Sequence, residues 1–249
     1  MLFKIALKNL LGARLRTFLN VLVTAFSFFL ILFMSAMYDG MLQHAKQVTM
    51  DTEIAGGAYW HPEYDPLDPM TFEDAHSALP TEVETLVDEK KAFPVLVSQA
   101  SIYPGGRIMP TIMKGIPPAQ NIVNMPTDAL SGHEEIAIPV LIGKGMASDT
   151  KLEVGDAFTI RWLDADLTYD ADEGTVVHIM DTENFKLDMG HIWIPLNKAQ
   201  AMLAMEGEAT YVTYEKGIPP VQNKGDWIPR DINYLVQDME AIIEADKPG

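Results

Sequence analysis

Six histidines and several carboxylates are the side chains of this chain whose types could support metal or acid–base chemistry. No two histidines have the i, i+4 spacing that places two imidazoles on one helix face, and His133 lacks the second histidine of an H-E-x-x-H zinc site. His178 and His191 lie in segments that favour strands, where a hydrogen-bonded structural histidine is the better interpretation. The histidines are His44, His61, His76, His133, His178 and His191. We therefore predict no metal site.

An acidic stretch at residues 164–173 resembles a calcium loop in composition but not in spacing. Tyr169 occupies the place where an EF-hand loop needs glycine, and the glutamate at the twelfth position is missing. The pattern favours a solvated hairpin tip, with weak cation binding or a basic partner as the alternative. Its acids are Asp164, Asp166, Asp170, Asp172 and Glu173.

The motifs of nucleotide binding and covalent catalysis are missing from the sequence. Gly143-Lys144-Gly145 is followed by Met146, whereas a Walker A loop requires G-x-x-x-x-G-K-[ST]. There is no G-x-S-x-G motif, and the chain has no cysteine, which excludes thiolate chemistry and disulfides. We predict no catalytic residue and no cofactor site on this chain, and hence no enzyme.

A short internal repeat is the remaining candidate for a binding motif. The segment K-G-I-P-P-A-Q-N at residues 114–121 recurs as K-G-I-P-P-V-Q-N at residues 216–223. Each copy follows an expected strand, and Pro-Pro cannot continue a strand ladder. Two equivalent strand exits are the simpler interpretation, and a shared ligand motif is the alternative.

The element that must position all of these groups is an apolar stretch, Thr17–Tyr38, without a charged side chain. As a helix it would reach roughly 33 Å, enough to cross a bilayer core of about 30 Å. Four bases and no acid precede it, so the positive-inside rule places the N-terminus in the cytoplasm. A cleaved signal peptide is the alternative, but the apolar run is long for one and no A-x-A site follows.

The expected organisation has four parts along the chain. Residues 1–17 form an interfacial helix on the cytoplasmic side, because apolar and basic positions alternate at helical spacing. Residues 18–38 form the transmembrane helix and residues 39–56 a helical stalk. Residues 57–245 form the extracytoplasmic domain, with a central lobe at about residues 134–205.

The charge of the chain is divided unevenly between these parts. The net charge is −17 overall, and four bases occur before Asp39, so the remainder carries −21. Such an acidic domain argues against nucleic-acid binding, which requires clustered bases. Without disulfides, the stability of the domain must come from packing.

The periodicity of the outer part predicts an α+β fold. Pro104-Gly105-Gly106 joins two expected strands as a hairpin, and Thr81 with Glu84 has the pattern of a capping box. A proline-rich loop is expected at residues 60–70. The expected strands are residues 95–103, 108–116, 135–141, 157–163, 175–180, 191–194 and 210–215, and the expected helices are 81–91, 143–150, 195–205 and 232–245.

Five motifs in order resemble the ABC-transporter permeases of the FtsX, MacB and lipoprotein-releasing type. Lys4–Thr17 runs directly into a span, Met113–Pro117 is similar to a strand-ending G-[IV]-x-P element, and Ile142–Ala147 is followed by the turn Leu152–Asp156. Ile194–Gln200 is similar to the V-P-L-x-x-A-Q element of that family.

The resemblance implies a permease with a two-lobed, mixed α/β extracytoplasmic domain of the MacB-like periplasmic core type. It implies that ATP-driven movements of the spans are relayed to this domain as mechanical work, most plausibly for lipoprotein release. MacB-type members carry their ATPase ahead of the first span; this chain starts almost at the span, so a separate cytoplasmic ATPase is expected to bind the ATP. The bacterial inner membrane is the expected location.

The expected partners are that ATPase, a second permease subunit in a homo- or heterodimer, the lipid bilayer, and a lipoprotein or its periplasmic chaperone. The hairpin at residues 163–174 is short and lacks proline, unlike the hook loop that captures the chaperone in one family subunit. The chain stops near the expected second span, so we expect a fragment that cannot transport by itself. A single-pass binding or scaffold module and a tethered enzyme are the alternative functions.

Overall fold

The computed structural model describes residues 14–182, 184–219, 221 and 224–235. The chain divides into two compact units, residues 1–47 and residues 48–249. The expected interfacial helix falls almost entirely on residues 1–13, outside the described residues. The last part of the expected helix 232–245 and part of the second repeat copy also fall outside them.

Helix α2 (Arg14–Thr49) is a single uninterrupted helix whose apolar side chains are exposed. It is long and apolar enough to cross a membrane, and it is the one such helix in the described residues. The predicted span and the predicted helical stalk therefore belong to one helix. A soluble core helix would bury these side chains against protein, and none of the side chains of α2 is buried.

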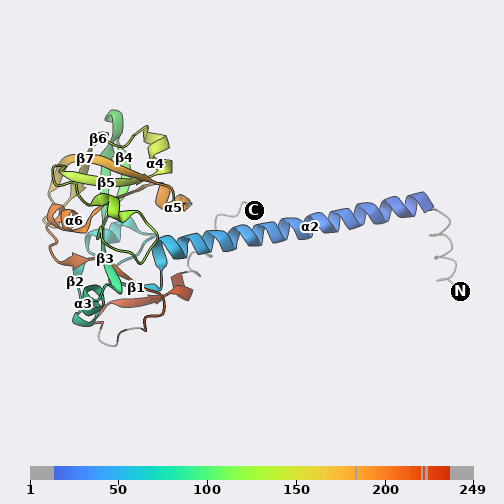
Figure 1. Cartoon of the computed structure of the whole chain (residues 1–249), viewed down its shortest axis with the longest axis horizontal. Helices are drawn as coiled ribbons and strands as arrows, with labels where there is room; N and C mark the ends of the chain where they lie inside the picture. The colour runs from blue at the N-terminus through green and yellow to red at the C-terminus, as the bar shows by residue number, and fades with distance from the viewer. Residues whose placement is uncertain (1–13, 183, 220, 222–223, 236–249) are drawn as a thin grey trace. The chain divides into compact units, whose positions relative to one another are not determined.

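The second unit is built around one large sheet (Figure 1). In the described residues its strand order is β11-β1-β10-β3-β4-β8-β5-β7-β6, and β3 also pairs with β6. The pairs β4–β8 and β5–β7 are parallel and the others are antiparallel. The strands are β1 (Gly57–Trp60), β3 (Ala92–Tyr103), β4 (Met109–Ile116), β5 (Ile138–Gly143), β6 (Ala157–Leu163), β7 (Tyr169–Met180), β8 (His191–Pro195), β10 (Tyr211–Tyr214) and β11 (Ile228–Asp231).

Strand β3 belongs to two groups of strands because its two halves have different partners on one edge. Its residues Ala92–Val95 pair with β10, and its residues Ala100–Tyr103 pair with β6. The second pairing closes β3, β4, β8, β5, β7 and β6 into a barrel. Figure 1 shows β4 to β7 at one end of the domain and β1 with α3 at the other.

The barrel interior is the largest apolar core. Alternate residues of its strands point inward, and helix α6 (Leu196–Leu203) packs Ala199 and Leu203 against them. A second apolar cluster includes Val95, Ile116, Trp193 and Tyr211, and a third surrounds Tyr59 and Val212 beside helix α3 (Thr81–Asp88). The mixed α/β fold with an N-terminal apolar helix is as predicted.

Smaller elements complete the domain. They are the 3-10 helices η2 (Pro69–Glu73), η3 (Pro104–Gly106) and η4 (Thr127–Leu130), helices α4 (Lys144–Thr150) and α5 (Phe185–Asp188), and the strand pair β2 (Ser77–Ala78) with β9 (Glu208–Ala209). The central lobe was expected at about residues 134–205, and the barrel also includes β3 and β4, which precede that range.

Two local predictions are wrong. The N-cap of α3 is Pro80 and not Thr81: the extended backbone of Pro80 lets its carbonyl accept from the Glu84 amide, and no side chain caps the helix. The helix also ends at Asp88, before Lys90 takes a positive φ of 59°. The second error is the long acidic tip, because Tyr169 to Gly174 extend β7 and pair with β6, which leaves a turn at residues 164–168.

Candidate functional site

A five-residue π-helical turn, Met50–Ile54, follows α2 directly, and we call it the junction turn. The Ala55 amide donates to the Met50 carbonyl at 2.8 Å, which is an i, i+5 hydrogen bond. Ala55 then adopts a positive φ of 50°, a conformation that non-glycine residues rarely take. Single π-turns of this kind occur often at functional sites, and strained backbone persists where the surroundings hold it in place.

Both lysines of the internal repeat bind the junction turn. Lys114 in β4 donates from Nζ to Glu53 Oε1 at 3.1 Å, and Lys216, just after β10, donates to Asp51 Oδ1 at 2.9 Å. The first pair is largely buried, with side-chain exposures of 5% for Lys114 and 26% for Glu53. The second pair is exposed, at 51% and 42%. The repeat therefore supplies two cations to one acidic turn.

The buried ammonium group of Lys114 also lies among aromatic rings. Its Nζ is 4.9 Å from the ring centre of Trp193 and 5.8 Å from that of Tyr211. Burial raises the pKa of Tyr211 well above its usual value, and Glu53 raises it further. Burial likewise raises the pKa of Tyr64, an effect that the nearby Lys114 charge partly opposes. These phenols stay neutral, so the charge on Lys114 is balanced by Glu53.

Two further bonds attach the junction turn to loops of the domain. The Asn124 amide donates to the Asp51 carbonyl at 2.7 Å, and Asn184 Nδ2 donates to Thr52 Oγ1 at 3.4 Å. Thr52 is buried and donates its own hydroxyl to the Val48 carbonyl at 2.8 Å. The turn thus contacts four segments that lie far apart in the sequence.

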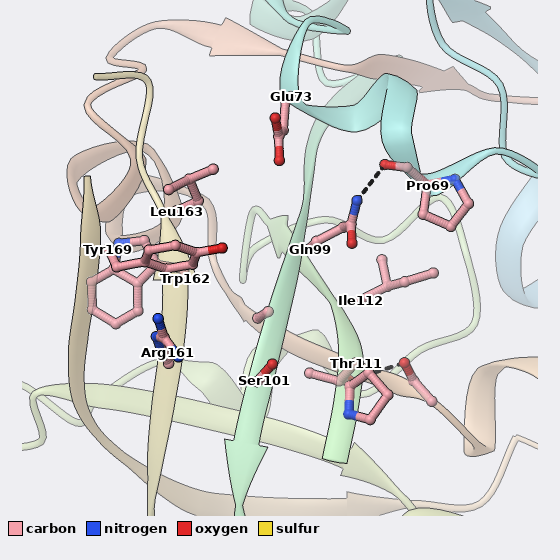
Figure 2. Close-up of a pocket in the computed structure, with 13 residues that line it drawn as sticks. Pro69, Glu73, Gln99, Ser101, Thr111, Ile112, Arg161, Trp162, Leu163 and Tyr169 are labelled. Atoms are coloured by element: carbon pink, nitrogen blue, oxygen red, sulfur yellow. Dashed lines mark hydrogen bonds between the residues drawn. The ribbon is translucent and has the colours of Figure 1, made fainter. Parts of the chain in front are cut away.

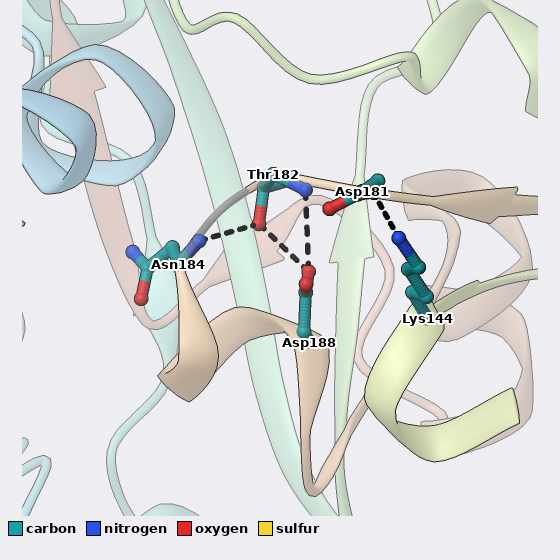
Figure 3. Close-up of polar contacts among 5 residues, drawn as sticks. All are labelled: Lys144, Asp181, Thr182, Asn184 and Asp188. Atoms are coloured by element: carbon teal, nitrogen blue, oxygen red, sulfur yellow. Dashed lines mark hydrogen bonds and ion pairs between the residues drawn. The ribbon is translucent and has the colours of Figure 1, made fainter. Parts of the chain in front are cut away.

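The loop that carries Asn184 is itself ordered by side-chain hydrogen bonds (Figure 3). Thr182 Oγ1 donates to Asp188 Oδ1 at 2.8 Å and accepts from the Asn184 amide at 3.3 Å. Nearby, Lys144 Nζ donates to Asp181 Oδ2 at 2.7 Å, and this hydrogen bond raises the pKa of Lys144.

Two glycines after the junction turn allow the backbone to pack closely against the end of β10. The Gly56 amide donates to the Tyr214 carbonyl at 2.8 Å. A Cβ atom on Gly56 would lie 2.3 Å from the Glu215 carbonyl oxygen, which no side chain permits. Gly57 combines a φ of 135° with a Tyr214 hydroxyl 2.4 Å from its would-be Cβ. Glycine at both positions is required for β1 to pair with β10.

The junction turn is attached to the domain by ion pairs and hydrogen bonds. Its charged groups neutralise one another, and its hydroxyl and amide groups are engaged with the protein. The arrangement holds the junction turn against β4, the exit of β10 and two loops.

The two repeat copies have different backbones, which corrects the expectation of equivalent strand exits. Lys114 to Ile116 lie within β4, whereas Lys216 and Gly217 lie in a turn after β10. A Cβ atom on Gly115 would lie 2.4 Å from Ala199 Cβ, so this glycine admits α6, while Gly217 has a φ of 88° and open space. What the copies share is the lysine that pairs with the junction turn.

Four of the histidines, His61, His76, His133 and His191, make contacts within the domain. His191 is buried in β8, bonded to the Met189 carbonyl at 3.1 Å and stacked on Trp193, and His133 bonds to the Ala129 carbonyl at 3.1 Å. His61 and His76 lie near one another: His76 pairs with Glu208, and burial lowers the pKa of His61. No group of three or more His, Asp or Glu with metal-binding geometry occurs in the part of the chain that the structure describes.

The acidic residues and the Gly-Lys-Gly motif also have local roles. Asp164 Oδ1 accepts from the amides of Asp166 and Thr168 at 2.9 and 2.8 Å, so this carboxylate caps its own turn. Gly143 is the N-cap of α4, and a Cβ atom there would lie 2.2 Å from Asp188 Cα. A Cβ on Gly145 would lie 2.5 Å from Met189 Sδ, so both glycines serve close packing.

Sequence reasoning missed Asp51, Thr52 and Glu53, which were assigned only to a stalk. One signal could have found them: two lysines at equal positions of a repeat require two carboxylates, and Asp51 with Glu53 is a compact acidic pair next to a glycine break. It would not have revealed which lysine is buried.

Comparisons with known proteins find solved structures that are similar to this chain. No protein-family model matches the sequence, and no curated protein matches it significantly. The periplasmic region of MacB from Actinobacillus actinomycetemcomitans is similar with a TM-score of 0.49 and 8% identity, over 81% of this chain and 97% of that one. The extracellular domain of the noncanonic ABC-type transporter YknZ from Gram-positive bacteria is similar with a TM-score of 0.42 and 13% identity, over 75% and 94% of the two chains. The structural neighbours of this chain are thus the periplasmic region of MacB and the extracellular domain of YknZ.

Proposed function

We propose that this chain is part of an ABC-transporter permease that transmits movement of its membrane helix to an extracytoplasmic domain. A separate ATPase in the cytoplasm supplies the energy, and the work done outside is the release or export of lipoproteins at the bacterial inner membrane. The observation that carries the proposal is the junction turn, where the end of an apolar helix is held by both lysines of the repeat.

The structural places of the family-like motifs support this function. Met113–Pro117 supplies the buried lysine of the junction and the end of β4. Ile142–Ala147 forms the passage from β5 into α4, and Ile194–Gln200 forms the passage from β8 into α6. These three motifs lie where the barrel meets a helix or the junction turn, whereas Leu152–Asp156 forms a largely exposed turn before β6.

The chemistry of the domain also supports a mechanical role over an enzymatic one. The carboxylates and lysines near the junction turn are paired with one another, and His133 and His191 bond to backbone carbonyls. A catalytic group requires access to a substrate and a partner that moves its proton. The Lys114–Glu53 pair is largely buried and both carboxylates of the junction turn are engaged by lysines, which favours attachment over catalysis.

The first experiment tests the partner. The chain, tagged in its own cells and extracted in a mild detergent, should co-purify with an ATPase that contains a Walker A motif and with a second permease subunit, both identified by mass spectrometry. Recovery of the chain from intact membranes without any ATPase would contradict the permease and favour a single-pass binding module.

The second experiment tests the coupling. With the partner ATPase, hydrogen exchange of β4 and β8 amides should change when ATP is added, and Glu53→Gln should reduce that change. The exchanged pair Glu53→Lys with Lys114→Glu should restore it, because the attraction is retained with reversed signs. Equal ATP responses in wild type and Glu53→Gln would contradict transmission through this junction.

A further inference from the structure

A pocket with a volume of about 350 Å³ lies on the outer face of the barrel. Its floor is formed by Gln99 and Ser101 of β3 with Ile112 of β4. One wall comes from η2 and the other from the β6–β7 hairpin (Figure 2). Its volume is in the range of sites for small ligands and peptide side chains, roughly 300–1,000 Å³.

The position of the pocket follows from the strand order. On one edge of β3, residues 92–95 pair with β10 and residues 100–103 pair with β6. Residues 96–99 lie between these two segments and pair with neither β10 nor β6. Helix η2 packs at this gap, where Gln99 Nε2 donates to the Pro69 carbonyl at 2.7 Å. The gap between β10 and β6 along this edge of β3 leaves room for a ligand.

Opposite charges face one another across this pocket. Glu73 of η2 points its carboxylate inward, and Arg161 of β6 lies on the other wall beneath the Tyr169 ring (Figure 2). The guanidinium carbon of Arg161 is 4.1 Å from the Tyr169 ring centre, a cation–π contact that fixes the side chain. No ion pair of Arg161 is found among the described residues, although the hairpin is rich in acids. Its N–H donors can therefore take a carboxylate from a ligand.

The polar groups of the floor are held in fixed orientations before any ligand arrives. Because the Gln99 amide nitrogen is bonded to Pro69, its carbonyl oxygen is presented to the pocket as an acceptor. Thr111 Oγ1 donates to the Gly190 carbonyl at 2.9 Å, which fixes the opposite rim. Ile112, Leu163 and Pro110 add apolar surface. Such pre-organisation lowers the entropic cost of binding.

We propose that this pocket binds a short peptide segment that has a carboxylate for Arg161 and a basic group for Glu73. The net charge of the domain attracts basic peptides over long range, and Arg161 then selects those that also have a carboxylate. An apolar side chain of the peptide lies on Ile112 and Leu163. The binding of such a peptide does not depend on the proposed transport function.

The test uses the full chain in lipid nanodiscs and isothermal titration calorimetry with three peptides. One is acetyl-Lys-Ala-Asp-amide, the second is acetyl-Lys-Ala-Ala with a free terminal carboxylate, and the third is acetyl-Lys-Ala-Asn-amide, which has no carboxylate. We expect a Kd of about 0.1–1 mM for one or both carboxylate peptides and binding about tenfold weaker for the asparagine peptide. The tighter of the two carboxylate peptides identifies the source as a side chain or a chain end.

Three variants make the result specific. Arg161→Gln should lower the affinity for the carboxylate peptides to that for the asparagine peptide. Glu73→Gln should lower the affinity for all three peptides. Arg107→Gln removes a similar charge outside the pocket and should leave all affinities unchanged. The proposal would be overturned if neither carboxylate peptide bound the wild type more tightly than the asparagine peptide does, if binding were unchanged in Arg161→Gln, or if no heat were seen at millimolar concentration.

Discussion

At the scale of single residues, the two repeat lysines make the same kind of ion pair in different surroundings. Lys114 is buried among aromatic rings, whereas Lys216 is half exposed. Removing one partner of a buried pair leaves the other charge without compensation, and removing one partner of an exposed pair leaves it in water. The repeat therefore contains its own matched control.

We predict that Lys114→Met lowers the free energy of unfolding of the domain by about 2–3 kcal/mol, less than for a fully buried pair because Glu53 is 26% exposed. Lys216→Met should lower it by less than about 1 kcal/mol. Urea unfolding followed by tryptophan fluorescence measures both. An equal loss of unfolding free energy in the two variants would show that burial does not make the Lys114–Glu53 pair more important for stability than the Lys216–Asp51 pair.

Buried tyrosines predict the alkaline limit of stability. Burial raises the pKa of Tyr214 to about 12 and also raises the pKa of Tyr59, Tyr64 and Tyr211. The unfolded chain releases these phenolic protons near pH 10 and the folded chain at higher pH, so the contribution of the tyrosines to stability is constant below about pH 10 and is lost as the pH rises toward 12. Tyr214→Phe removes one of these phenolic protons, so it should make the fall of the free energy of unfolding with pH less steep.

Ultraviolet titration of phenolate in the folded protein checks the same point. The buried rings should titrate after the exposed ones, with a component near pH 12 that disappears in Tyr214→Phe. Complete titration of every tyrosine by pH 11 in protein that is still folded would contradict the assignment.

At the scale of elements, glycine decides how closely a helix approaches the barrel. The would-be Cβ of Gly115 lies 2.4 Å from Ala199 Cβ, so β4 and α6 are in contact at this point. We predict that Gly115→Ala destabilises the domain by about 1–3 kcal/mol, because α6 must move away.

The matched variant is Ala199→Gly, which removes the methyl group that clashes. The double variant should be less destabilised than the sum of the single variants by about 1 kcal/mol or more, measured by urea unfolding of all four proteins. Strict additivity would mean that Gly115 is required for its backbone conformation and not for contact.

The sequence predicted those elements that have clear periodicity or turn residues. The β3–β4 hairpin and α4 were predicted because Pro104-Gly105-Gly106 and Gly143 mark their ends. Strands β1 and β11 were missed because Gly56-Gly57 indicates a break, and because Ile228–Asp231 contains a proline and two charges. β1 becomes a strand through its pairing with β10 and β11, and β11 through its pairing with β1, which local sequence does not show.

The same limit applies to the candidate site. Lys114 and Lys216 were noticed as a repeat, but their common partner depends on β4 and β10 both lying beside the junction turn. That arrangement arises from long-range pairing along β3. Pocket residues such as Glu73 and Arg161, from two distant segments, carry no common sequence signal for the same reason.

At the scale of the whole molecule, the absence of cysteine allows a direct test of the attachment. Thr52 and Asn184 are joined by a hydrogen bond in the junction, and the chain has no native thiol to compete. The double variant Thr52→Cys with Asn184→Cys should form an intramolecular disulfide under mild oxidation, seen as a shift on non-reducing gels after proteolysis. The single variants should show none. Failure of the double variant to cross-link would mean that the turn does not stay against this loop.

The pairing of β1 has a consequence for how the chain is made. β1 is completed by residues 57–60, but both of its partners, β10 and β11, lie beyond residue 210. At about 5–20 residues per second, roughly 8–30 s of synthesis separate the first strand from its partners. During that interval the nascent chain presents an apolar, unpaired strand next to the ribosome or the translocation channel. A pause in translation before residue 211 would lengthen the time for which this strand stays unpaired and accessible to proteases.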